Sequence, residues 1–125
     1  MTENEISKVI VHAAYKIHTT LGPGLLESVY ETTMAYELTK AGLRARRQQP
    51  MPVEYETVRM EVGFRADLLV DNKVIIEIKS IEAIAPVHRK QLLTYLRVTD
   101  KHLGMLINFN VELIKHGISG VVNNL

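Results

Sequence analysis

The chain has 125 residues, of which 46% are hydrophobic and 23% charged, and its formal net charge is +1 at pH 7. This length supports one small hydrophobic core, so we expect a single domain over residues 1–125. The lack of cysteine excludes disulfide frameworks, thiolate zinc sites and cysteine nucleophiles. The near-neutral charge indicates no class of partner. Neither a secretion signal nor a bilayer-spanning apolar run is found, so a cytoplasmic protein is expected.

Two amphipathic helices are predicted at the start of the chain. Over residues 2–21, apolar residues recur every three or four positions, which is the spacing of one helical face. Thr2 and Glu5 have the spacing of a capping box, and Gly22-Pro23 suits the end of the helix. A second apolar stripe opens at Gly24 and ends at Gly42, which predicts another helix.

Strands are predicted after the second helix, because the apolar period changes to two. The alternation is found in residues 43–49, 51–56 and 59–70, and Pro50 and Pro52 mark a break or a sheet edge. A turn at residues 71–72 leads into the β-branched run 73–79, which predicts a hairpin. Pro86 suits the first turn of a third helix that runs to about Val98.

A strand at residues 103–109 and a weaker strand or turn segment at 111–122 complete the order α-α-β-β-β-α-β with a short β-like tail. The third helix allows the last clear strand to return parallel to an earlier one. We therefore expect an α/β (α+β) fold in which helices flank a mixed sheet.

The register of the hairpin decides which side chains meet. A loop of two residues would mix charged and aliphatic side chains on both faces. A loop of three residues, 71–73, separates them, so burial of the apolar face favours it. One face then carries Phe64, Ala66, Leu68, Val70, Val74, Ile76 and Ile78, and the other carries Arg65, Asp67, Leu69, Ile75, Glu77 and Lys79.

In this register Asp67 and Glu77 are cross-strand neighbours, with Lys79 on the same face. Two carboxylates roughly 5 Å apart at Cβ repel unless one binds a proton or a cation lies between them. Mg²⁺ or Mn²⁺ suits such oxygen ligands, and an ammonium beside it can activate a water or stabilise charge on a phosphate. The alternative is a solvated salt-bridge ladder. The aliphatic residues around Glu77, typical of a strand covered on both faces, weaken that alternative.

These residues resemble a known family. Ala66-Asp67 followed by Glu77-Ile78-Lys79 resembles the D…ExK core of the PD-(D/E)XK nuclease superfamily, which has the restriction-endonuclease-like fold. Residues 24–30, GLLESVY, resemble the G-x-x-E-x-x-Y signature of the small bacterial GxxExxY family within it. The likeness runs from about Leu21 through Asn108. Ala66 stands where the superfamily name has proline, at a position that varies.

The resemblance implies a role for each matching residue. Asp67 and Glu77 would bind the metal, the carbonyl of Ile78 would be a further ligand, and Lys79 would be the catalytic lysine. Glu27 would be an additional catalytic acid directed toward the metal. The implied cofactor is Mg²⁺ or Mn²⁺, and the implied substrate is nucleic acid, DNA more than RNA.

Four further residues are candidates for lining the cleft: Tyr30, His88, Gln91 and Tyr95. Gln91 and Tyr95 match a Q-x-x-x-Y pattern of some related nucleases, and His88 shares their helical stripe. Each has a structural alternative. Tyr30 suits a core aromatic with a hydrogen-bonded hydroxyl, and the stripe suits a solvated face. Glu27 equally suits the first turn of its helix, where the dipole favours an acid.

Five basic residues are candidates for phosphate contacts: Arg44, Arg46, Arg47, Arg89 and Lys90. The three arginines among residues 44–47 equally suit a solubilising edge strand.

The leading hypothesis is a metal-dependent nuclease that hydrolyses phosphodiester bonds. One alternative is a catalytically inactive nucleic-acid-binding or protein-interaction module on the same fold. A third interpretation is a domain whose acids only solvate the sheet. The sequence does not decide whether the chain forms a homodimer.

Overall fold

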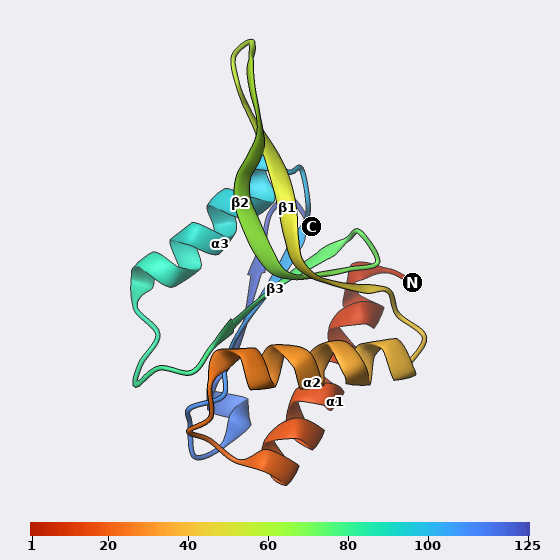
Figure 1. The fold of residues 1–125 in the computed structure, drawn as a ribbon, viewed down its shortest axis with the longest axis vertical. Helices are drawn as coiled ribbons and strands as arrows, with labels where there is room; N and C mark the ends of the chain where they lie inside the picture. Colours follow the sequence, from red (N-terminus) through yellow and green to blue (C-terminus); the bar gives the residue numbers. More distant parts are fainter.

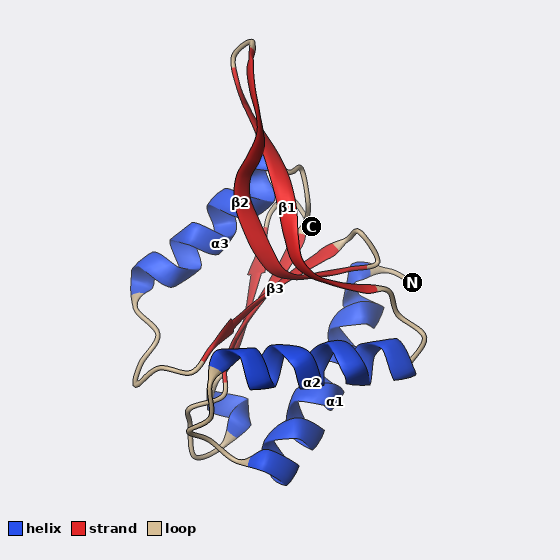
Figure 2. Ribbon diagram, in the orientation of Figure 1, coloured by secondary structure: helices blue, strands red, loops and turns tan.

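Five strands form one mixed sheet, in the order β1-β2-β3-β4-β5, and three helices flank it (Figure 1, Figure 2). The computed structural model describes all of residues 1–125. In chain order the elements are α1 (Glu3–Leu21), α2 (Glu27–Lys40), β1 (Ala45–Tyr55), β2 (Val58–Val70), β3 (Val74–Lys79), α3 (Pro86–Val98), β4 (Leu103–Asn108), a 3₁₀ turn (Ile114–His116) and β5 (Ile118–Val122). This order confirms the predicted fold class.

The ends of the first two helices follow from local chemistry. The Thr2 side chain accepts a hydrogen bond from the Glu5 N–H, and the Glu5 carboxylate accepts one from the Thr2 N–H, which confirms the capping box. The second helix begins at residue 27 rather than 24, because Gly22 and Gly24 have φ of 74° and 98°. Those left-handed conformations form a loop instead of a helical turn.

The pairing of the strands confirms the predicted topology. β2 and β3 pair antiparallel through Leu68↔Ile76, Leu69↔Ile75 and Val70↔Val74, so the loop between them has three residues. β3 and β4 pair parallel, and α3 is the crossover between them. The two predicted segments 43–49 and 51–56 form a single strand, β1. Because β1 is an edge strand, Pro50 and Pro52 are tolerated within it.

Hydrophobic clusters lie on both faces of the sheet. One contains the inner faces of α1 and α2 with alternate residues of β2, β3 and β4. The other contains Leu92 and Leu96 of α3 with residues that include Leu69 and Ile75. The central strand β3 is therefore covered on both sides, as the run of aliphatic residues predicts.

The predicted division of side chains between the two faces is wrong for Phe64 and Ala66. Both belong to the α3 cluster, whereas Leu68 and Val70 pack with α1 and α2. β2 pairs with β3 only from Leu68 onward, and before Leu68 it is paired with β1 alone. A two-stranded ribbon twists more strongly than a wide sheet, so the part of β2 before residue 67 turns toward α3.

No helix of the structure is both long and apolar enough to cross a membrane.

Candidate active site

The most unusual feature of the sheet is the fork at which β2 and β3 separate. The last residue pair between them is Leu68↔Ile76, and the next position would pair Asp67 with Glu77. At that position, hydrogen bonds from backbone N–H groups to the two carboxylates take the place of backbone–backbone hydrogen bonds. The Asp67 Oδ2 accepts a hydrogen bond of 2.8 Å from the Ile78 N–H, and the Glu77 Oε2 accepts one of 3.0 Å from the Asp67 N–H. The two carboxylates are thus held side by side at the fork.

Burial at the fork disfavours two negative charges. The side chain of Glu77 is buried, and desolvation first and the Asp67 carboxylate second raise its pKa to about 8. Burial is also the main cause that raises the pKa of Asp67. The ammonium of Lys79 acts in the opposite direction on both pKa values, but more weakly. The fork therefore favours either a proton or a cation between the two groups.

The oxygen atoms at the fork that are not held by a backbone N–H suit a hard divalent cation. Asp67 Oδ1 has only a 3.4 Å contact with the amide of Gln48, and Glu77 Oε1 accepts no hydrogen bond. The Ile78 N–H points at Asp67, and the carbonyl of a strand residue points to the same side as its N–H, so this carbonyl also faces the fork. Oxygen donors of this kind are those that Mg²⁺ takes with water and phosphate.

The structure does not bring Glu27 into a three-carboxylate cluster. No group of three or more His, Cys, Asp or Glu side chains converges on a point that could hold a metal ion. Glu27 lies in the first turn of α2, and its Oε2 accepts a 3.0 Å hydrogen bond from the Ser80 N–H. The Ser80 hydroxyl in turn donates to the Leu25 carbonyl. Glu27 thus anchors the residue that directly follows Lys79.

Sequence reasoning missed a different acid, Glu31, which is 6% exposed. Its Oε2 accepts hydrogen bonds from Arg47 Nε and Nη2, at 3.2 and 3.0 Å, and its Oε1 accepts one of 2.6 Å from the Gln48 amide. Its negative charge also raises the pKa values of Asp67 and Glu77. Glu31 is one helical turn after Glu27, so it shares that helix face, and this spacing is the signal that could have identified it.

Gln48 was missed as well, and its backbone explains why it reaches the fork. In the β1–β2 register it falls opposite Asp67, between the pairs Arg47↔Leu68 and Gln49↔Ala66. Its φ is +48°, a left-handed conformation that is uncommon for glutamine and costs about 1–3 kcal/mol. Its side-chain amide lies between Glu31 and Asp67. Strain of this kind concentrates at functional sites.

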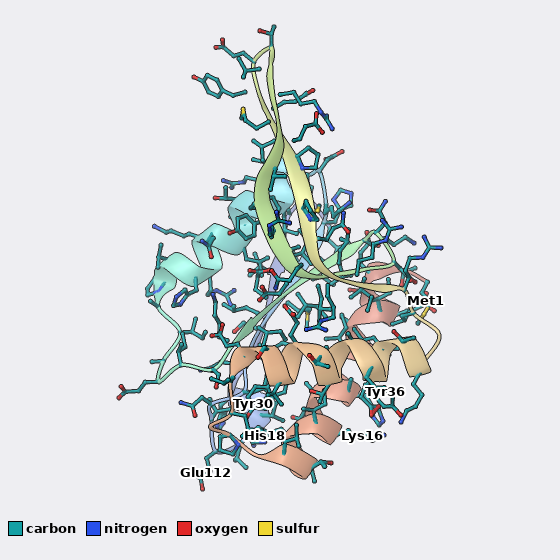
Figure 3. All side chains as sticks on the ribbon, viewed as in Figure 1. Met1, Lys16, His18, Tyr30, Tyr36 and Glu112 are labelled. Atoms are coloured by element: carbon teal, nitrogen blue, oxygen red, sulfur yellow. The ribbon has the colours of Figure 1, made fainter.

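Tyr30 lies in the core and does not line a cleft (labelled in Figure 3). Its ring stacks on Phe109 with centroids 4.4 Å apart. Its hydroxyl donates to the Gly22 carbonyl at 2.6 Å and accepts from the Leu25 N–H at 3.1 Å. Tyr30 therefore fixes the loop that leads into Glu27.

Replacing Tyr30 with phenylalanine is expected to lower the free energy of unfolding by about 1 kcal/mol, because two partly buried backbone groups lose their hydrogen-bond partner. Urea unfolding measures the change. Tyr36→Phe is the matched control, since Tyr36 is exposed and its hydroxyl makes no hydrogen bond. Equal losses in the two variants would contradict the role given to the Tyr30 hydroxyl.

The predicted polar stripe of α3 divides into three different environments. His88 Nδ1 accepts a 2.9 Å hydrogen bond from the Ala85 N–H and so caps the start of the helix. Gln91 is exposed. Tyr95 stacks on Phe64, with ring centroids 3.8 Å apart. Burial, followed by the charges of Glu77 and Asp67, raises the Tyr95 pKa, so Tyr95 lies within reach of the charges at the fork.

The five basic candidates do not gather on one surface. Arg47 is paired with Glu31, and the Arg89 guanidinium donates to the Gly120 carbonyl. Arg46 lines a groove of about 650 Å³ with residues from the end of α3. Arg44 and Lys90 have exposed side chains.

The mixed sheet, its parallel crossover through α3 and the acidic fork define the restriction-endonuclease-like class of fold. Residues 4–121 match the PD-(D/E)XK nuclease superfamily, and the chain belongs to that superfamily. No curated protein and no solved structure matched the chain.

Proposed function

We propose that the chain is a metal-dependent nuclease that hydrolyses phosphodiester bonds of nucleic acid, DNA in preference to RNA. The observation that carries the proposal is the pair of carboxylates at the fork, Glu77 buried and Asp67 half-buried, each held through one oxygen by a backbone N–H, with the ammonium of Lys79 beside them. We also propose that the chain belongs to the GxxExxY family, on the strength of residues 24–30.

Each residue of the fork has a distinct task in this proposal. Asp67 and Glu77, with the carbonyl of Ile78, would hold Mg²⁺ or Mn²⁺. A divalent cation supplies Lewis-acid polarisation of a phosphate and lowers the pKa of a bound water. Lys79 orients the attacking water and stabilises the negative charge that develops on the phosphate. Tyr95 lines the α3 side of the site.

Two acids of α2 support these residues. Glu27 holds the backbone after Lys79 through Ser80, which positions the end of β3. Glu31 acts through Gln48 on Asp67. Neither requires direct contact with the cation, so both are positioning residues in this proposal.

A cleavage assay tests the proposal. Labelled DNA and RNA, single and double stranded, are incubated with the protein in Mg²⁺, in Mn²⁺ and in excess chelator. We expect cleavage of DNA that requires the divalent cation and is lost in Asp67→Asn. Cation binding without cleavage of any substrate would favour the non-cleaving binding module, and cleavage that survives both chelator and substitution would overturn the proposal.

Gln48 offers a test of the positioning network. Gln48→Gly accommodates φ of +48° without strain but removes the amide between Glu31 and Asp67. We expect an unchanged melting temperature and an Mn²⁺ affinity reduced by about 10–100-fold, as for other supports of metal ligands. Gln49→Ala is the control, because its side chain bonds only to the neighbouring Pro50 carbonyl. An unchanged affinity in Gln48→Gly would refute the role.

A further inference from the structure

The chain leaves the sheet directly after Lys79, and side chains hold its next residues. The last backbone hydrogen bond between β3 and β4 runs from the Phe109 N–H to the Lys79 carbonyl, at 2.9 Å. From there the chain continues toward the start of α3 at Pro86 (Figure 1). The residues that follow Lys79 therefore decide how firmly the end of β3 is held.

The side chain of Asn108 binds the chain at this point. Asn108 ends β4 and pairs with Lys79 in the parallel register. A continued ladder would give the Ile81 N–H a backbone carbonyl of β4 as its acceptor. Instead, the Ile81 N–H donates to Asn108 Oδ1 at 3.1 Å, and Asn108 Nδ2 donates to the Ile81 carbonyl at 3.0 Å. One side-chain amide thus binds both backbone groups of Ile81.

Burial makes this contact a rigid one. Asn108 is 2% exposed, and a buried amide costs free energy unless its polar atoms are hydrogen-bonded. Its Oδ1 also accepts a 3.2 Å hydrogen bond from the Asn110 N–H. Three hydrogen bonds to the backbone therefore fix the orientation of the amide, and with it the position of Ile81.

The residue between Lys79 and Ile81 is held as well. The Ser80 N–H donates to Glu27, and the Ser80 hydroxyl donates to the Leu25 carbonyl at 2.7 Å. The ammonium of Lys79, in contrast, makes no ion pair within 4.0 Å. No ion pair of its own orients the Lys79 side chain, so its direction depends on how the backbone at the end of β3 is held.

We propose that Asn108 is a positioning residue for Lys79: by binding Ile81 it fixes the end of β3 and so places the ammonium beside the fork. The inference rests on the role given to Lys79 in the proposed function. Asn108 makes no hydrogen bond to Asp67 or Glu77, which are held by N–H groups at the fork itself. Its effect is therefore on the lysine and not on the carboxylates.

A double-mutant cycle on the cleavage rate tests the proposal. Asn108→Ala is expected to slow single-turnover cleavage of DNA at saturating Mg²⁺ by about 10–100-fold, since a displacement of about 1 Å can cost this much. In a Lys79→Ala background the same substitution should change the rate by less than about twofold, because the group that it positions is gone. Equal rate losses in the two backgrounds would overturn the proposal.

The affinity for Mn²⁺ separates positioning of the lysine from damage to the fork. Asn108→Ala should bind Mn²⁺ as the wild type does, because the hydrogen bonds of both carboxylates remain. A loss of affinity as large as the loss of rate would contradict the proposal. If Asn108→Ala does not fold, Asn108→Ser keeps a hydroxyl as donor and acceptor and should show smaller changes of the same kind.

Asn123→Ala is the matched control. Asn123 is half-buried, and its amide donates a 3.0 Å hydrogen bond to the Lys101 carbonyl, just before β4 begins. This bond lies at the opposite end of β4 from Asn108. Asn123→Ala should therefore cleave DNA at the wild-type rate. A rate loss equal to that of Asn108→Ala would show that the loss follows from any weakened end of β4 and would overturn the proposal.

A measurement without substrate or cation distinguishes failure of this inference from failure of the proposed function. Lysines that carry ¹³C-dimethyl groups give separate NMR resonances, and Lys79→Arg identifies that of Lys79. In excess chelator, Asn108→Ala should shift the Lys79 resonance, and Asn123→Ala should leave it in place. An unmoved resonance in Asn108→Ala would overturn the positioning role in a chain that cleaves DNA. A shifted resonance in a chain that cleaves nothing would support the placement of Lys79 and overturn the proposed function.

Discussion

Replacing Lys79 with alanine is expected to slow the cleavage of nucleic acid by about 10²–10⁴-fold, the usual contribution of a positioned proton-transfer group. Lys79 ends β3 beside the two carboxylates, and its ammonium makes no ion pair within 4.0 Å. Its charge therefore contributes little to the folded state and is available to the substrate. Single-turnover cleavage at saturating Mg²⁺ measures the effect.

Two comparisons separate a loss of chemistry from a loss of fold. Lys8→Ala removes one positive charge from the exposed side of α1, far along the chain from the fork, and should cleave at the wild-type rate. The melting temperature of Lys79→Ala should match that of the wild type. Wild-type cleavage by Lys79→Ala would remove this lysine from the mechanism, whereas a large drop in melting temperature would assign it a structural role.

Without a divalent cation, the free energy of unfolding is expected to fall as the pH rises from about 5 to about 8. Folding raises the pKa of Glu77 from 4.5 to about 8, so the folded chain binds this proton more tightly than the unfolded chain does. The resulting stability is fully present below the unfolded pKa and is lost as the pH rises through the folded pKa. The expected loss is on the order of 3 kcal/mol. Chemical denaturation in chelator at a series of pH values measures it.

Two conditions identify the group responsible. Glu77→Gln cannot ionise, so its stability should lack most of this slope and should exceed that of the wild type at pH 8. Saturating Mg²⁺ should restore the wild type at pH 8, because a cation at the fork favours both carboxylates in their charged form. Glu112→Gln, at an exposed position, should leave the slope unchanged. A slope that persists in Glu77→Gln would contradict the assignment.

The fork could be anticipated from sequence because burial selects the register. Only the three-residue loop puts Leu68, Val70 and Ile76 on one buried face, and that same choice makes Asp67 and Glu77 neighbours. The three pairs between β2 and β3 confirm the loop length. Period-two alternation and the cost of exposing aliphatic side chains were sufficient for this part of the site.

The alternation could not show where the sheet divides. Phe64 and Ala66 follow the same sequence pattern as Leu68, yet they pack on the other face because β2 has left β3 by that point. Whether a strand keeps a partner depends on the whole sheet, and period-two alternation is the same in both cases. The left-handed backbone of Gln48 has the same origin, since nothing in the local residues requires it.

The roles of residues that depend on burial could not be predicted from the sequence either. Arg47 was a candidate for phosphate contact, but it pairs with Glu31 on α2, a partner sixteen residues away. Tyr30 matched a family signature, yet its hydroxyl bonds the loop just before its own helix. The Arg47 contact arises from the packing of α2 against β1, and the Tyr30 contacts arise from the path of the loop before α2.

The fork of β2 and β3 is the proposed cation site of the chain. Calorimetric titration of the chain with Mn²⁺ tests it most directly, with wild type and the double variant Asp67→Asn, Glu77→Gln compared at pH 8. We expect one tight site per chain in the wild type and none in the double variant, with both proteins folded by circular dichroism. Equal Mn²⁺ binding by the two proteins, or none by the wild type, would contradict the claim.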